Sequence, residues 1–122
     1  MVDRPTVFVV QEPWPDRQTG ESRRDFTPAE RHGRLKFLLP HDYTIGKDIA
    51  AVLLNNGLAA WRPMDFLLCA GHPVAIGVAT ALAVARGPIN LLVWSGRRRN
   101  YAIVKVDLFE ELKARRAAAP AL

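Results

Sequence analysis

The sequence has a single cysteine, Cys69, among 122 residues, so neither an internal disulfide nor a cysteine-based metal cage can form. Cys69 ends an apolar run, and we interpret it as a small buried hydrophobic residue. No apolar stretch approaches the roughly 20 residues that a transmembrane helix needs. The first residues also lack the pattern of a secretory signal. We therefore expect a cytoplasmic protein that makes no membrane contact.

Several chemical motifs are also missing. The chain has no Gly-x-Gly-x-x-Gly fingerprint, no Gly-Lys-Ser/Thr phosphate loop and no His-Glu-x-x-His pair. We therefore expect no cofactor and no metal, although a site made of His41, Asp42 and His72 is conceivable. No internal repeat or low-complexity tract is present.

The composition is that of an ordinary globular domain, with 49% hydrophobic and 24% charged residues. A chain of this length predicts one domain over residues 1–122. The net charge is +5, and the excess of Lys and Arg lies in the second half of the chain. This basic character permits a phosphate-rich partner without requiring one.

Hydrophobic patterning predicts alternating strands and helices. Strands are expected at residues 6–10, 35–39, 65–70, 89–94 and 101–106, and helices at 27–33, 45–58, 73–85 and 108–116. Two consecutive strand–helix–strand units require parallel pairing with right-handed crossovers. We expect an α/β fold, a small Rossmann-like three-layer sandwich whose mostly parallel sheet ends in an antiparallel hairpin and a final helix. A long loop at about 11–26 and a frayed tail at about 117–122 complete it.

Local signals predict how the elements begin and how they are buried. Thr27 and Glu30 form a capping box around Pro28, with the Thr27 hydroxyl as the helix cap. Pro73 suits the first position of the third helix, and Asp107 caps the last one. The near-continuous apolar run at 89–94 predicts a strand buried on both faces.

A ligand site is expected beyond the carboxyl ends of the parallel strands, where loops and helix N-termini converge. That edge gathers residues 11–14, 40–44, 70–73 and 94–96. The candidate ligand-binding residues there are Gly71, His72, His41, Asp42, Tyr43 and Trp94. Free amides in the turn at Gly71 and His72 indicate an anion site, although a plain tight turn would contain the same residues.

Catalysis receives weaker support. His41 or His72 could serve as a general base, with Asp42 and Tyr43 beside it. Polar turn residues would look the same, so we assign no catalytic residue.

A basic tip is expected on the C-terminal hairpin. Arg97, Arg98 and Arg99 lie between Trp94 and Tyr101, a combination that can hold phosphates and stack a base. A solvated hairpin tip is the alternative interpretation, because charge there also discourages aggregation.

Two stretches resemble a family of small, mostly uncharacterised α/β proteins of bacteriophages and prophages. One is residues 25–38, Asp-Phe-Thr-Pro-Ala-Glu-Arg-His-Gly-Arg-Leu-Lys-Phe-Leu, and the other runs from Asp-Phe-Leu-Leu at 65–68 to Asn-Leu-Leu-Val-Trp at 90–94. The resemblance covers most of the chain and includes no catalytic motif. It implies a phage or mobile-element context and an α/β fold.

Three function classes remain open. The first is a binding module for a nucleotide or another phosphate-bearing ligand, in a host-interaction or anti-defence role. The second is a protein-interaction or dimerisation module without a small ligand, which would contact a host protein or a second copy through the loop at 11–26. The third is a phosphodiesterase-like enzyme that uses loop histidines. We rank the binding module first and the enzyme last, because no convincing set of nucleophile, base and carboxylate is present.

Overall fold

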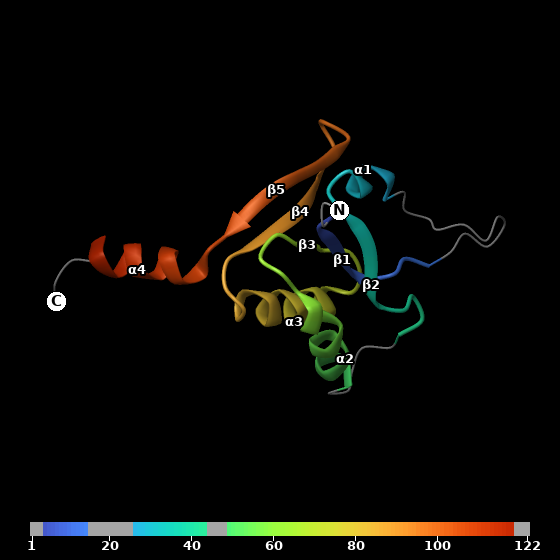
Figure 1. Cartoon of the computed structure of the whole chain (residues 1–122), viewed down its shortest axis with the longest axis horizontal. Helices are drawn as coiled ribbons and strands as arrows, with labels where there is room; N and C mark the ends of the chain where they lie inside the picture. The colour runs from blue at the N-terminus through green and yellow to red at the C-terminus, as the bar shows by residue number, and fades with distance from the viewer. Residues whose placement is uncertain (1–3, 15–25, 44–48, 119–122) are drawn as a thin grey trace.

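A computed structural model describes residues 4–14, 26–43 and 49–118 (Figure 1). These residues form five strands and four α-helices, which are β1 (Thr6–Gln11), α1 (Thr27–Glu30), β2 (Arg34–Leu39), α2 (Ile49–Gly57), β3 (Phe66–Leu68), α3 (Pro73–Val84), β4 (Ile89–Ser95), β5 (Asn100–Val106) and α4 (Leu108–Ala118). A 3₁₀ turn, η1 (Leu58–Ala60), follows α2 directly. Most of the predicted loop, the predicted start of the second helix and the end of the tail lie outside the described residues.

The five strands form one mixed sheet in the order β2-β1-β3-β4-β5. The first three pairings in that order are parallel and the β4–β5 pairing is antiparallel, so the predicted parallel sheet with a C-terminal hairpin is confirmed. Strand β1 lies between two parallel partners. Its residues Val7 to Val10 are fully or almost fully buried, as a continuous apolar run predicts.

The two faces of the sheet are covered unequally (Figure 1). Helices α2 and α3 pack on one face. Helix α3 lies close to the sheet because its buried stripe consists of small residues spaced by four, Ala75, Ala79 and Ala83. Among the described helices, only the four-residue α1 packs on the other face, where Phe26 and Ala29 join the second core cluster.

This unequal cover changes two predictions. The Rossmann-like three-layer sandwich is not confirmed, since α1 is too short to form a helical layer and α4 extends away from the sheet (Figure 1). The fold is α/β with a five-stranded mixed sheet. The expectation that the strand at 89–94 is buried on both faces is wrong at its end. Val93 and Trp94 are 44% and 49% exposed, because the β4–β5 hairpin extends past α2 and α3 (Figure 1).

The predicted helix starts have different outcomes. The capping box is wrong, because Thr27 is the first helical residue and Phe26 is the N-cap, with no side-chain cap. The Phe26 carbonyl instead accepts a 2.8 Å hydrogen bond from the Ala29 N–H. Pro73 does begin α3. The Asp107 carboxylate does cap α4, because it accepts a 3.2 Å hydrogen bond from the Glu110 N–H.

Asp65, expected as the first residue of a strand at 65–70, has a different role. Strand β3 spans only Phe66–Leu68, and the Asp65 side chain is fully buried just before it. Its carboxylate accepts hydrogen bonds of 2.8 Å from the N–H groups of both Thr6 and Arg62, and one of 3.3 Å from the Arg62 guanidinium. Asp65 therefore ties the start of β1 to the start of β3. No helix in the described part of the chain is long and apolar enough to cross a membrane.

Candidate functional site

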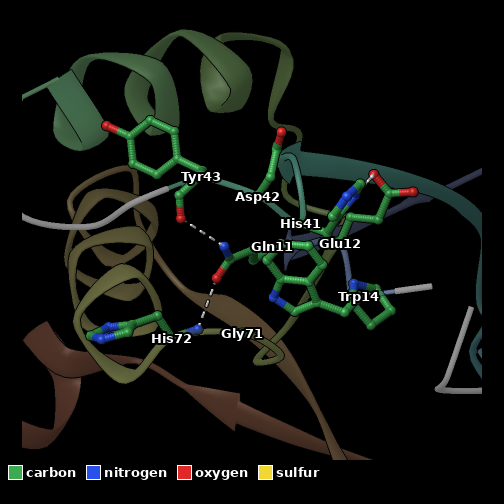
Figure 2. Close-up of a pocket in the computed structure, with 9 residues that line it drawn as sticks. Gln11, Glu12, Trp14, His41, Asp42, Tyr43, Gly71 and His72 are labelled. Atoms are coloured by element: carbon green, nitrogen blue, oxygen red, sulfur yellow. Dashed lines mark hydrogen bonds and ion pairs between the residues drawn. The ribbon is translucent and has the colours of Figure 1, made fainter. Parts of the chain in front are cut away.

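An open pocket of about 510 Å³ lies at the carboxyl edge of the parallel strands (Figure 2). Its walls are residues 11–14, which end and follow β1, residues 41–43, which follow β2, and residues 71–72, which follow β3. Three of the four segments that the sequence places at this edge therefore meet in one cavity. Loops after adjacent parallel strands converge in this way because the strands end at the same side of the sheet.

Gln11 joins the three walls of the pocket. Its side-chain amide donates to the carbonyl oxygens of Pro40 at 3.3 Å and Tyr43 at 3.4 Å. Its side-chain carbonyl accepts a 3.0 Å hydrogen bond from the His72 N–H (Figure 2). Gln11 is only 8% exposed, so these bonds satisfy a polar group that would otherwise be costly to bury. Gln11 therefore holds the loops after β2 and β3 against the end of β1.

The turn at Gly71 and His72 is shaped by close contact with Gln11. Gly71 has φ of 124°, which strongly favours glycine, and a Cβ at this position would collide with the Cβ of Gln11. His72 is the N-cap of α3, and its Nδ1 accepts a 3.1 Å hydrogen bond from the Val74 N–H. Two amides at this turn, those of His72 and Val74, therefore already have acceptors. An anion at the turn would have to compete with both side chains.

The opposite wall carries an aromatic pair. Trp14 is 59% exposed, and its ring meets the His41 ring edge to face with centroids 4.7 Å apart. The His41 Nδ1 lies 3.9 Å from a carboxylate oxygen of Glu12, an ion pair whenever the imidazole is protonated. Glu12 and Trp14 thus contact the His41 ring from two sides (Figure 2).

The side chains of the other three predicted residues at the pocket, Tyr43, Asp42 and His72, point away from the Trp14 ring (Figure 2). The Tyr43 ring points toward the helices and packs against the core beneath α2 and α3, so Tyr43 contributes its backbone carbonyl to the pocket. The Asp42 carboxylate points away from Trp14, and so does the His72 ring. The carboxylate beside His41 is thus Glu12 and not Asp42. Among the described residues, no group of three or more His, Cys, Asp or Glu side chains could hold a metal ion.

Gln11, Glu12 and Trp14 are not among the predicted site residues. All three lie at or just after the end of β1, at the edge where the sequence places the ligand, and that position is the available signal. Their hydrogen-bonding and ionic partners lie in loops about 30 or more residues away, which local sequence patterns do not reveal.

Trp94 and the basic tip lie outside this pocket. The Trp94 ring packs edge to face on Tyr101 with centroids 5.1 Å apart, and Trp94 does not line the cavity. Arg97, Arg98 and Arg99 are exposed in the turn between β4 and β5, where the Arg98 N–H donates to the Ser95 hydroxyl at 3.4 Å. The structure therefore separates the predicted residues into a pocket and a hairpin tip.

Cys69 follows β3 directly and is partly buried. Burial raises the pKa of its thiol, and a hydrogen bond with Thr80 lowers it by a smaller amount. A thiol with a raised pKa is a poor nucleophile near neutral pH, which agrees with the small-hydrophobe interpretation.

Comparison with known proteins identifies the family. Neither the curated proteins nor the solved structures include a match to this chain. A family model described as Phage Pam3 gp32-like protein matches residues 5–108, which span every described element from β1 to β5. The phage context that the sequence resemblance implied is thereby confirmed. The chain belongs to the Phage Pam3 gp32-like protein family.

Proposed function

We propose that this phage-family protein is a binding module for a ligand of the nucleotide class, held mainly by its base in the pocket between residues 11–14, 41–43 and 71–72. The position of the pocket supports the proposal, because ligands of open α/β sheets bind beyond the carboxyl ends of the strands. Its walls belong to three different segments that Gln11 holds together, so a ligand there meets a preformed site.

The observation that carries the proposal is the exposed indole of Trp14. A tryptophan ring that is 59% exposed on a pocket wall offers a flat apolar face to a planar ligand. The His41 ring contacts the indole at a steep angle, which favours one orientation of the indole before a ligand arrives. Stacking of a nucleobase on such a face contributes about 1–3 kcal/mol.

The charges in the pocket favour the base over the phosphate as the main point of attachment. Glu12 supplies a carboxylate beside Trp14, which can accept hydrogen bonds from the amino and imino groups of a base. The described lining contains no Lys or Arg, and a phosphate would depend on the imidazole of His41. A phosphate group therefore adds less to affinity in this proposal than the base does.

Binding without turnover fits the geometry better than catalysis does. His41 has Glu12 as its orienting carboxylate, yet the described lining has no Ser, Thr, Cys or Lys that this pair could activate as a nucleophile. In a phage-family protein, binding of a nucleotide would withdraw it from host nucleotide signalling, and this is the anti-defence role that we propose.

A thermal-shift screen tests the function. Nucleosides, nucleotides and cyclic nucleotides are each added to the wild type, to Trp14→Ala and to the control Trp94→Ala, which removes an exposed indole outside the pocket. A ligand that binds the native state raises the Tm by mass action. We expect the rise in the wild type and in Trp94→Ala, and its loss in Trp14→Ala. No rise with any compound, or an equal rise in Trp14→Ala, contradicts the proposal.

A second candidate function, contact with nucleic acid, is favoured by the hairpin tip. Trp94 is 49% exposed beside three exposed arginines, and among the described residues no carboxylate forms an ion pair with Arg97, Arg98 or Arg99. Unpaired guanidinium groups beside an exposed aromatic ring suit a single-stranded phosphate backbone and its bases.

A further inference from the structure

No other described element packs on helix α4 (Leu108–Ala118) and buries its side chains. It extends away from the sheet, and every described side chain from Leu108 to Arg116 is exposed (Figure 1). Its large apolar residues are among them, with Leu108, Phe109 and Leu112 exposed by 42%, 65% and 49%. An isolated helix of 11 residues is marginal in water, so α4 needs a packing surface to persist.

The large apolar side chains of α4 lie on one face, which ends at Arg116, four residues after Leu112. Leu108 and Leu112 are four residues apart and Phe109 is next to them, so the three share one side of the helix. Glu111 and Arg115 are also four residues apart, and helical geometry puts both on the same flank of this apolar stripe. The stripe therefore has an acidic residue toward its start and a basic residue toward its end along one border.

This charge order is self-complementary for antiparallel pairing. In such a pair, a two-fold axis that passes beside Leu112, perpendicular to both helices, relates the two copies. The second helix then runs in the opposite direction, and the flank with Glu111 and Arg115 lies on the same side of both helices. Glu111 then lies opposite Arg115 of the second copy, and the same contact forms again with the roles exchanged. A parallel two-fold pair would instead bring this flank against the opposite flank of the second copy, so the Glu111–Arg115 contact would not form. We propose that α4 packs antiparallel on α4 of a second copy of this chain, so that the protein is a homodimer.

The adjoining strand enlarges the surface. Strand β5 is the edge of the described sheet and leads directly into α4. Its residues Ile103 and Val104 are 53% and 42% exposed. A stable interface buries about 800 Å² on each partner, more than one short helix provides. Because adjacent residues of a strand point to opposite faces of the sheet, one of these two side chains can extend the apolar area of α4 on a given face.

The proposed interface does not overlap the pocket. Val106, where β5 ends before α4, pairs with Ile89 at the start of β4, so α4 begins at the edge of the sheet opposite the pocket. The homodimer is therefore independent of the proposed ligand, and either proposal can fail without the other.

Light scattering coupled to size-exclusion chromatography tests the dimer. At about 100 µM protein, where a dimer with a micromolar dissociation constant is mostly formed, we expect a mass twice the 13.6 kDa of one chain. Leu112→Glu should halve that mass, whereas Val52→Glu, at a side chain 58% exposed on α2, should leave it unchanged. Circular dichroism of each variant checks that it is folded. A monomeric wild type, or a folded Leu112→Glu that stays dimeric, overturns the proposal.

Charge reversal tests the antiparallel register. Glu111→Arg places two arginines in each symmetric contact, and we expect the dissociation constant to rise about fivefold to tenfold. The double variant with Glu111→Arg and Arg115→Glu restores both pairs, so it should return to within about twofold of the wild type. Equal weakening in the single and double variants overturns this register.

Discussion

The side-chain carbonyl of Gln11 accepts a hydrogen bond from the backbone N–H of His72, a residue 61 positions later in the chain, at 3.0 Å. This bond joins the end of β1 to the N-cap of α3 across the floor of the pocket (Figure 2). The same side chain donates to two carbonyls of the loop after β2. The shape of the pocket therefore depends on one buried amide.

Gln11→Ala should lower the free energy of unfolding by about 2 kcal/mol, because it leaves the His72 N–H and two carbonyls without their partner. Urea unfolding measures the change. Glu12→Ala is the control, since that neighbouring side chain is 46% exposed and should stay within about 0.5 kcal/mol of the wild type. Equal stability of the Gln11→Ala protein and the wild type would show that the three bonds do not hold the loops.

Gly71 and Gly77 should respond to alanine in opposite directions. Gly71→Ala should destabilise the protein by about 2 kcal/mol or more, because φ is 124° and the new Cβ would collide with Gln11. Gly77→Ala should stabilise it by about 1 kcal/mol, because Gly77 lies within α3 and a Cβ there meets no atom within 4 Å. Thermal unfolding of both variants provides the comparison, and a tolerated Gly71→Ala would refute the close approach at this turn.

The thiol of Cys69 should react slowly. Its pKa is raised by burial, so at pH 8 a smaller fraction is thiolate than in free cysteine, and the thiolate is the nucleophile. Alkylation by iodoacetamide should accelerate as the pH rises through the elevated pKa, and unfolding in urea should bring the rate to that of a cysteine peptide. A native rate at pH 8 equal to that of the peptide would contradict this environment.

Neutralising the hairpin tip should weaken any contact with nucleic acid. Replacement of Arg97, Arg98 and Arg99 by Gln should reduce both the affinity for single-stranded oligonucleotides and the steepness with which salt lowers it. Fluorescence anisotropy at several salt concentrations measures both quantities. Binding that is insensitive to salt, or equal in the triple variant, would eliminate the hairpin as a phosphate-contacting surface.

The sequence predicts the strands, and the loops that meet at one edge of the sheet, well because both depend on local signals. A continuous apolar run predicts the buried β1, and the alternation of strands and helices predicts which loops share an edge. The Pro73 and Asp107 helix starts are confirmed for the same reason, since each depends on residues within one turn.

Predictions that depend on tertiary packing are less successful. Thr27 has the capping sequence, yet burial of Phe26 in the second core cluster accompanies a helix start one residue earlier. Trp94 lies near the end of β4, but it is 49% exposed and does not line the pocket. Gln11 acts through partners about 30 and 60 residues away, which no local pattern encodes.

The most direct test of base binding is an NMR titration that follows the indole N–H signals of the three tryptophans. Trp14→Phe assigns one signal, and a nucleotide that raises the Tm is then added to the ¹⁵N-labelled wild type. We expect the chemical shift of the Trp14 signal to change with nucleotide concentration until it saturates. The signals of Trp61 and Trp94, which do not line the pocket, should change no more than they do with ribose phosphate alone, which is the control. Movement of the Trp94 signal with no change at Trp14, or equal shifts with ribose phosphate alone, would contradict a base held in this pocket.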